Sequence, residues 1–181
     1  MLYSLGQRAF GENQVQQLES RMNSLEELPL EWHMIGTLQS NKINKLIELR
    51  PTLFQSLDSL KLAQALNKRL ENRNQSMSCL LQINSANEKS KSGVLVEEAE
   101  EIYEQIIDNC PQIKLKGVMS IGAHTEDKKE VQKSFESTYN IYEKLNKKYN
   151  ANICSMGMSN DYELAIKCGS NLVRIGSKIF K

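Results

Sequence analysis

The chain has 181 residues, enough to bury a substantial core as one domain, and no segment has the composition of a linker between two domains. Its 23 Lys and Arg residues and 22 Asp and Glu residues give a net charge of +1, which provides no general attraction to nucleic acid or to an anionic membrane. No apolar stretch is long enough to cross a bilayer and the first residues lack a signal-peptide pattern, so we expect no membrane partner and no nucleic-acid partner.

Short apolar runs alternate with longer amphipathic segments along the chain. The apolar runs predict seven β-strands: Ala9–Asn13, Glu31–Gly36, Phe54–Leu57, Ser78–Asn84, Leu115–Gly122, Asn152–Met158 and Leu172–Ile175. The segments between them predict six helices: Val15–Ser24, Asn41–Leu49, Leu60–Asn72, Val96–Asn109, Lys128–Tyr149 and Tyr162–Cys168. Strands that alternate with helices in this way form βαβ units, which predicts an α/β protein with a parallel sheet.

The last two predicted strands both end in small and hydroxyl-bearing residues. Residues 155–159 lead into a helix, for which Asn160 and Glu163 have the spacing of a capping box, and the final strand ends in residues 173–177. Backbone N–H groups and the helix dipole favour an anion at such a helix start. In (β/α)8 barrels a phosphate is frequently bound between the loops after strands seven and eight. The sequence therefore predicts a site for a phosphorylated small molecule at this end of the chain.

The number of predicted strands is one short of a complete barrel. A (β/α)8 barrel usually needs at least about 200 residues, so the chain lacks about one βα unit. Met1–Gly6 has the pattern of a helix end with a glycine cap. We therefore expect residues 1–181 to form a single TIM-barrel domain that is N-terminally truncated, with strand one and most of its helix missing. Strands two and eight would face each other across a gap, and a mis-assigned start would explain the break most simply.

Several motifs resemble those of the pyridoxal 5′-phosphate homeostasis proteins. They are Gly6–Asn13, Trp32–Lys42 (WHxIGxLQxNK), Lys89–Gly93 (the KSG turn), Gly117–Met119 (G-x-M), Ser155–Asp161 (SMGMSxD) and Arg174–Ser177 (RIG[ST]). These motifs run in the family's order over nearly the whole chain. The resemblance implies the fold of the alanine racemase N-terminal barrel standing alone, and it implies that the cofactor is pyridoxal 5′-phosphate.

The resemblance also implies which residues bind this cofactor. They are Asn13, Met158, Ser159, Arg174, Gly176 and Ser177. The two serines and the glycine would hold the phosphate, while Asn13 would line the ring. Met158 would pack either against the ring or the loop, or in the core. Arg174 corresponds to the arginine that faces the pyridine nitrogen. A guanidinium keeps its proton, so it would leave that nitrogen unprotonated and make the ring a poor electron sink.

The family's Schiff-base lysine has no counterpart in this sequence. In the family it lies at the end of strand one in a VSK-like segment, which is absent here. A Schiff base needs a desolvated amine within reach of the aldehyde. Lys42 is predicted to begin a helix, and Lys89 and Lys91 belong to a loop. We therefore expect weak cofactor binding through the phosphate, without a permanent adduct at a specific lysine.

Two classes of function are compatible with the resemblance. The first is a non-catalytic cytoplasmic carrier, monomeric or weakly dimeric, that buffers pyridoxal 5′-phosphate and passes it to cofactor-dependent enzymes as candidate recipients. The second is a racemase-like enzyme that acts on amino acids through the same cofactor. Racemases of this fold carry a second β-domain that supplies a tyrosine base, whereas the tyrosines here fall in helical patterns. The carrier is therefore favoured, with no catalytic residue.

The remaining reactive side chains favour structural roles. The four cysteines, Cys79, Cys110, Cys154 and Cys168, lack metal-ligand spacing, so we expect no metal site and a reducing cytoplasmic environment. Cys79 and Cys154 lie in apolar runs and are predicted to be buried thiols. His33 is predicted to be a hydrogen-bonded core histidine, and His124 a polar loop residue in preference to a pocket residue.

Overall fold

A computed structural model describes residues 1–88 and 91–180 of the protein. Its strands are β1 (Ala9–Glu12), β2 (Glu31–Met34), β3 (Leu53–Leu57), β4 (Met77–Asn84), β5 (Val94–Leu95), β6 (Ile113–Ser120), β7 (Ile153–Met158) and β8 (Leu172–Arg174). Its α-helices are α1 (Val15–Ser24), α2 (Ile43–Leu49), α3 (Leu60–Glu71), α4 (Ala99–Asn109), α5 (Lys128–Tyr149) and α6 (Tyr162–Lys167). Short 3₁₀ turns cover Tyr3–Leu5, Ser40–Lys42 and Val96–Glu98.

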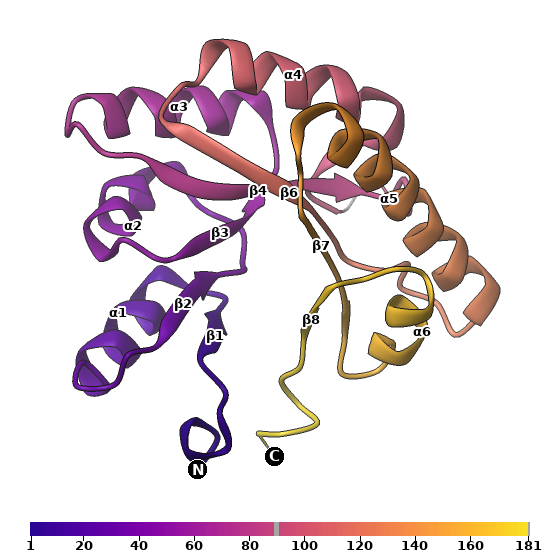
Figure 1. Cartoon of the computed structure of the whole chain (residues 1–181), viewed down its shortest axis with the longest axis horizontal. Helices are drawn as coiled ribbons and strands as arrows, with labels where there is room; N and C mark the ends of the chain where they lie inside the picture. Colours follow the sequence, from indigo (N-terminus) through magenta and orange to yellow (C-terminus); the bar gives the residue numbers. More distant parts are fainter. Residues whose placement is uncertain (89–90, 181) are drawn as a thin grey trace.

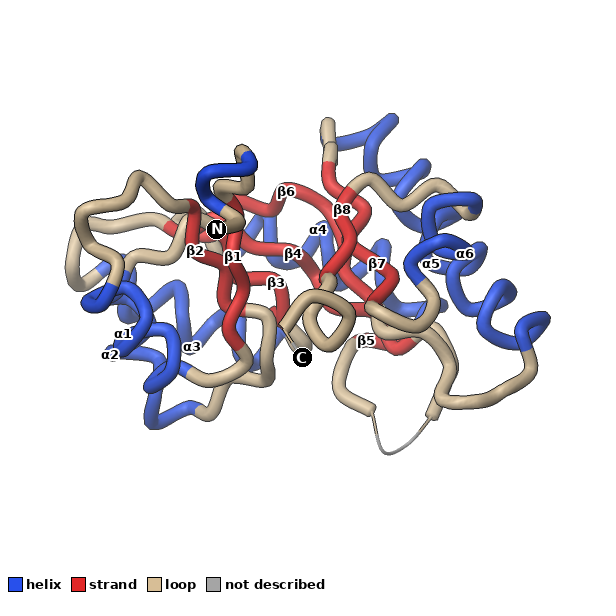
Figure 2. The backbone as a smooth tube through the Cα atoms, turned by 90° about the horizontal axis from the view of Figure 1, so that it is seen from below, coloured by secondary structure: helices blue, strands red, loops and turns tan. Residues whose placement is uncertain are grey.

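The strands form one parallel sheet that curls into an open barrel, with the helices on its outer side (Figure 1). The strand order is β1-β2-β3-β4-β6-β7-β8, and the short β5 pairs with β4 beside this path. The view from below shows the same arrangement, with helices outside the strands on both flanks (Figure 2). The α/β class and the parallel βαβ arrangement predicted from the sequence are therefore confirmed.

The barrel is open between its first and last strands. The sheet order starts at β1 and ends at β8, and no pairing joins these two strands in the part of the chain that the structure describes. Both ends of the chain lie near this opening (Figure 1). The predicted gap between two strands with unpaired edges is confirmed.

Two differences from the predicted elements have simple causes. The strand β5 was not predicted, because two residues are too few to establish an alternating pattern. The helices expected over residues 41–49 and 96–109 start as separate 3₁₀ turns, which are common at helix N-termini. At the start of the chain, the N–H of Gly6 donates to the carbonyl of Tyr3 with a φ of 95°, so the predicted glycine cap is confirmed on a 3₁₀ turn.

The two faces of the sheet carry different layers. Its outer face packs against the helices through an extensive apolar core that includes Leu18, Phe54, Tyr103 and Phe135. A separate small cluster is formed by strand residues alone: Leu53, Leu80 and Met119, with Ile153 and Leu172 packed against them. Because successive side chains in a strand point to opposite faces, this second cluster is the apolar layer of the barrel interior.

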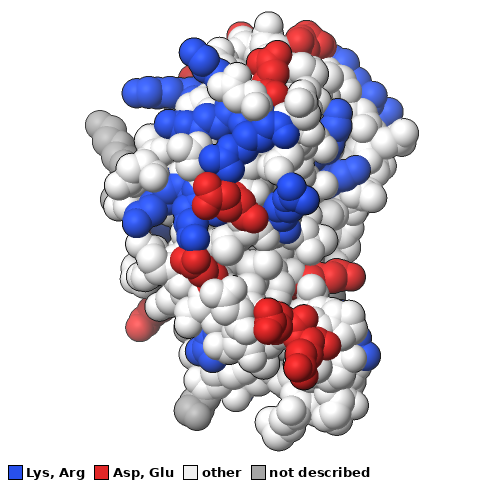
Figure 3. All heavy atoms as spheres, turned by 90° about the vertical axis from the view of Figure 1, so that its left-hand side faces the viewer, with Lys and Arg blue, Asp and Glu red and all other residues white. Residues whose placement is uncertain are grey.

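The surface carries both signs of charge. On the face that covers α1, α2 and α3, Lys and Arg side chains gather toward one end, with Asp and Glu side chains among and below them (Figure 3). This mixed face agrees with the balanced net charge of the sequence. Of the helices described, none is both long and apolar enough to span a membrane.

Candidate functional site

The loops after β7 and β8 meet at the carboxyl end of the sheet. Met158 at the end of β7 pairs in register with Arg174 at the end of β8. Beyond the strands, the hydroxyl oxygen of Ser159 accepts hydrogen bonds from the backbone N–H groups of Gly176, at 3.1 Å, and of Lys178, at 3.4 Å. Two backbone donors from one loop thus converge on one oxygen of the other loop.

The predicted capping box at the start of α6 is wrong. The helix begins at Tyr162, its N-cap is Asp161, and neither Asn160 nor Asp161 caps it with a side chain. The Asp161 carboxylate instead accepts the N–H of Met158 at 2.6 Å, while the Asp161 N–H donates to the Met158 carbonyl. This reciprocal pair closes a tight turn directly after β7. The predicted helix start at Tyr162 is confirmed, but the Asp161 carboxylate bonds the strand end and not the first helical turn.

Arg174 lies at the mouth of the barrel with its guanidinium held by two acceptors. Its Nη1 donates to the Ser155 hydroxyl at 2.7 Å, and its Nη2 donates to the Ser120 carbonyl at 2.8 Å. Burial lowers the pKa of Arg174 to about 10, and the nearby Asp161 carboxylate opposes the shift. The guanidinium therefore remains a cation at neutral pH, in a partly desolvated position where its charge is poorly screened.

A chain of hydrogen bonds continues from Arg174 across the barrel interior. The Ser155 hydroxyl donates to Gln55 Oε1 at 2.7 Å, and Gln55 Nε2 lies 3.0 Å from His33 Nδ1. Ser155, Gln55 and His33 are all buried. They form a polar layer above the apolar layer of the interior, and the prediction that His33 is a hydrogen-bonded core residue is confirmed.

The six predicted site residues do not all come together. The register and hydrogen bonds described above join Met158, Ser159, Arg174 and Gly176, and Ser177 lies exposed in the same loop after β8. Asn13 follows β1, at the other side of the opening (Figure 1). Among the described residues, no hydrogen bond links the Asn13 side chain to the other five. The structure therefore supplies one cluster from β7 and β8, while Asn13 follows the strand at the opposite edge of the sheet.

Two members of the site were not predicted from the sequence. Ser155 lies inside the SMGMSxD motif, and Gln55 lies beside Ser56 between the buried apolar residues of β3. A polar residue buried in such a strand needs a hydrogen-bond partner, so a hydrogen bond from the Gln55 side chain could have been expected. No pattern in the sequence indicates which partner Gln55 meets.

Lys91 is committed to other contacts. Lys91 Nζ donates to Glu88 Oε1 and to the Gly122 carbonyl, both at 2.9 Å, and thereby ties the loop after β4 to the loop after β6. The hydrogen bond from Lys91 is the main reason why the pKa of Glu88 is lowered. Lys42 ends the 3₁₀ turn before α2, as its predicted place at a helix start requires, and Lys89 lies outside the described residues.

The thiols and His124 have the structural roles expected of them. Cys79 and Cys154 are fully buried, and burial raises the pKa of the Cys154 thiol to about 12, so this thiol stays protonated and unreactive. His124 is exposed, and its backbone N–H donates to Glu88 Oε1 at 3.3 Å. Within residues 1–88 and 91–180, no group of three His, Cys, Asp or Glu side chains is arranged to hold a metal ion.

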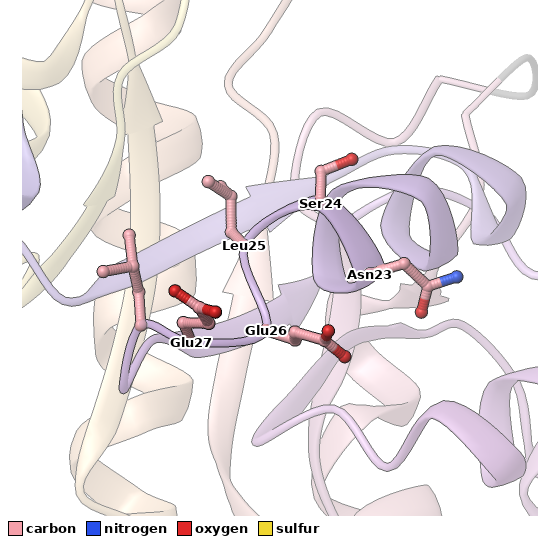
Figure 4. Close-up of a pocket in the computed structure, with 6 residues that line it drawn as sticks. Asn23, Ser24, Leu25, Glu26 and Glu27 are labelled. Atoms are coloured by element: carbon pink, nitrogen blue, oxygen red, sulfur yellow. The ribbon is translucent and has the colours of Figure 1, made fainter.

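A surface hollow at the end of α1 does not resemble a phosphate site. It is lined by Asn23, Ser24, Leu25, Glu26, Glu27 and Leu28 (Figure 4). Its charged groups are two carboxylates, which would repel a phosphate. The hollow also precedes β2, so it lies toward the amino ends of the parallel strands, away from the loops after β7 and β8.

Acid is expected to destabilise the fold through His33. Burial lowers the pKa of His33 from its ordinary value of 6.5, and the negative charge of Glu31 opposes the shift. The unfolded chain therefore binds a proton at this site at higher pH than the folded chain does, so the free energy of unfolding falls as the pH drops below about 6.5. Urea unfolding at about pH 7.5 and about pH 5.5 measures the decrease. A His33→Gln variant should lose less stability over this range, and an unchanged pH dependence in that variant would contradict the assignment.

A family model and several relatives match this chain over almost its whole length. The family model described as the alanine racemase N-terminal domain matches residues 2–181. The pyridoxal phosphate homeostasis protein of Helicobacter pylori strain 26695 is 59% identical over 179 residues, covering 99% of this chain and 79% of the relative. The human protein of the same name is 37% identical over 191 residues, covering 98% of this chain and 69% of the relative.

Solved structures also match this chain over nearly its whole length. PipY of Synechococcus elongatus PCC7942 with pyridoxal phosphate bound has a TM-score of 0.85 at 30% identity, and its form without the cofactor has a TM-score of 0.89 at 31% identity. Each comparison covers 99% of this chain and 84% of PipY. An alanine racemase of Clostridium difficile 630 has a TM-score of 0.78 at 18% identity, covering 96% of this chain and 44% of the racemase, which shows a shared fold. The predicted barrel of the alanine racemase N-terminal type is thereby confirmed.

Proposed function

The chain belongs to the alanine racemase N-terminal domain family and, within it, to the pyridoxal phosphate homeostasis proteins, and on this premise we propose that it binds pyridoxal 5′-phosphate in cofactor homeostasis. The convergence of the Gly176 and Lys178 N–H groups on the Ser159 hydroxyl carries the proposal. A phosphate oxygen beside the Ser159 hydroxyl could accept these backbone donors, which suit anions, and could also accept the Ser159 O–H. The exposed Ser177 hydroxyl belongs to the same loop, and a side chain added at Gly176 would meet no atom within 4 Å, so there is room for a ligand.

In the proposed site, Arg174 would set the protonation state of the pyridine ring. Pyridoxal 5′-phosphate supplies an aldehyde and a pyridine ring that can withdraw electrons when its nitrogen is protonated. The Arg174 guanidinium keeps its own proton and can only donate hydrogen bonds, so it would hold a ring nitrogen in its unprotonated form. Met158 is 37% exposed at the end of β7 and offers an apolar contact to the ring, while Asn13 would line the ring from the side of β1.

A non-catalytic carrier suits these residues better than a racemase. An unprotonated ring withdraws electrons weakly, which disfavours loss of a proton from an amino acid. Of the tyrosines, Tyr103 is buried on α4 against Tyr149 of α5, and the Tyr162 hydroxyl donates to Glu163 on α6. We propose that the protein buffers the cofactor and passes it to enzymes that use it. Incubation with L-alanine and cofactor, followed by chiral chromatography, tests this assignment, because sustained formation of D-alanine would overturn it.

Binding of phosphate monoesters should depend on Ser159 and Ser177. Calorimetric titration with inorganic phosphate and with pyridoxine 5′-phosphate, which lacks the aldehyde and so cannot react with surface lysines, measures the affinity. Removing one hydrogen bond to a charged phosphate costs about 1.5–3 kcal/mol, so Ser159→Ala and Ser177→Ala should each weaken both ligands by about tenfold to a hundredfold.

A serine at the other end of the barrel provides the control. Ser24 is exposed at the end of α1, where its hydroxyl donates to the Ser20 carbonyl. Ser24→Ala should leave both affinities unchanged. The proposed function fails if the parent protein binds neither ligand, or if the Ser159 and Ser177 variants bind both ligands as the parent does.

A further inference from the structure

The polar layer of the barrel interior is built by strand positions of one face. In β3, β7 and β8, a polar residue follows two positions after an apolar member of the interior cluster, so both point to the same side of the sheet. These pairs are Leu53 with Gln55, Ile153 with Ser155, and Leu172 with Arg174. In β4 the same spacing relates Leu80 to Gln82, but the Gln82 amide donates to the Ser92 carbonyl. The register that buries the apolar layer therefore also brings the three polar side chains to one level of the barrel.

The hydrogen bonds of this layer form one directed chain. The guanidinium can only donate, so the Ser155 oxygen must accept from Arg174 Nη1. The Ser155 O–H is then used toward Gln55 Oε1, which leaves the Gln55 amide nitrogen to donate to His33 Nδ1. With the pKa of His33 lowered, the ring is neutral at neutral pH and can accept at this nitrogen. In this hydrogen-bond network, each donor therefore meets an acceptor, from Arg174 through Ser155 and Gln55 to His33.

Two members of this hydrogen-bond network, Gln55 and Ser155, are shielded from solvent. Gln55 is 1% exposed and Ser155 is fully buried, so neither side chain can exchange its partner for bulk water. Loss of the Gln55 amide would free the Ser155 hydroxyl to turn, and the acceptor that holds Arg174 Nη1 would no longer be fixed. The Ser120 carbonyl alone would then hold the guanidinium, at Nη2. One acceptor fixes the plane of a guanidinium less well than two do.

We propose that Gln55 and Ser155 are positioning residues that hold the Arg174 guanidinium in the orientation with which it meets the ring of the bound cofactor. This inference rests on the proposed function and extends it to two residues beneath the binding surface. They act on the ring and not on the phosphate, because the phosphate cradle is formed by the loops around Ser159 and makes no hydrogen bond with either residue in the described part of the chain.

The test compares two ligands across matched variants. Calorimetry gives the affinities for pyridoxine 5′-phosphate and for inorganic phosphate, and the ratio of the two isolates the contribution of the ring. Gln55→Met, which keeps the length of the side chain but not its hydrogen bonds, and Ser155→Ala should each lower this ratio by about tenfold, with phosphate affinity unchanged. Gln82→Met is the matched control, because Gln82 is also buried in the sheet but donates to the Ser92 carbonyl. It should leave the ratio as it is in the parent.

A double-mutant cycle separates positioning from a general packing effect. If Gln55 acts through Arg174, the Gln55→Met change should have no further effect on the ratio in an Arg174→Leu background. Nuclear magnetic resonance of the parent should also show His33 protonated at Nε2 and free of a proton at Nδ1, a state that Gln55→Met should release. Should Gln55→Met fail to fold, Ser155→Ala tests the same link from the Arg174 side.

The outcomes distinguish this inference from the function on which it rests. A parent protein that binds neither ligand overturns both. A parent that prefers pyridoxine 5′-phosphate, together with Gln55→Met and Ser155→Ala variants that keep this preference, overturns the positioning role alone. Equal loss of both ligands in these variants also overturns it, since the effect would then not belong to the ring.

Discussion

A Gly157→Ala variant is expected to lose about 2–5 kcal/mol of folding free energy. Gly157 lies in β7 with a φ of +94°, in the left-handed region that costs residues with a side chain about 1–2 kcal/mol. A methyl group there would lie 2.5 Å from the Cβ of Ala165 and 3.0 Å from the Cα of Tyr162, both on α6. Relieving such an overlap costs about 1–3 kcal/mol more, because the helix must move away from the strand.

Urea unfolding monitored by circular dichroism measures this loss, and Gly176→Ala provides the control. Gly176 lies in the exposed loop after β8, and a Cβ placed on it would meet nothing within 4 Å. Its replacement should change the free energy of unfolding by less than about 0.5 kcal/mol. Equal unfolding midpoints for the two variants would contradict the close packing of β7 against α6. In Gly157→Ala, movement of α6 should also displace Ser159 and weaken phosphate binding.

Replacement of Arg174 by leucine is expected to weaken cofactor binding and to destabilise the fold as well. The variant removes the cation at the barrel mouth and leaves the Ser155 hydroxyl and the Ser120 carbonyl without their donor. Loss of a charged hydrogen bond to the ring nitrogen should weaken pyridoxine 5′-phosphate by about tenfold to a hundredfold. The unsatisfied buried groups should lower the free energy of unfolding by about 1–3 kcal/mol.

Arg174→Lys separates charge from geometry in this prediction. An ammonium group retains the positive charge but lacks the planar pair of donors that reaches Ser155 and Ser120 together. We expect this variant to bind inorganic phosphate as the parent does and still to lose most of its preference for pyridoxine 5′-phosphate in calorimetry. A Lys variant with the full preference of the parent would show that charge alone suffices.

Arg73→Leu is the surface control for the arginine variants. Arg73 follows α3 and pairs with Glu48 at 3.3 Å, with both side chains substantially exposed. Exposed ion pairs contribute about 0–1 kcal/mol, so this variant should unfold at nearly the same urea concentration as the parent. Its affinity for both ligands should not change. A loss of binding as large as that in Arg174→Leu would mean that the effect comes from net charge and not from the site.

The elements that could be predicted from the sequence are those with a clear period. The bounds of α1 and α5 are confirmed to the residue, and all seven predicted strands exist, because apolar spacing reports directly which face of an element is buried. The motifs around Trp32–Lys42, Ser155–Asp161 and Arg174–Ser177 were sufficient to predict the family. The capping box was wrong, because a carboxylate at Asp161 can bond the preceding strand as well as the following helix, and its spacing does not distinguish the two.

The sequence by itself therefore determined the order of strands and helices, the parallel sheet and the family of this protein. The tertiary structure alone decided which polar side chains meet. Gln55 and Ser155 are separated by 100 positions and share no local pattern, yet they form a hydrogen bond inside the barrel. Periodicity assigns a side chain to a face of its strand, whereas its partner across the interior is set by strand register and by the curvature of the sheet.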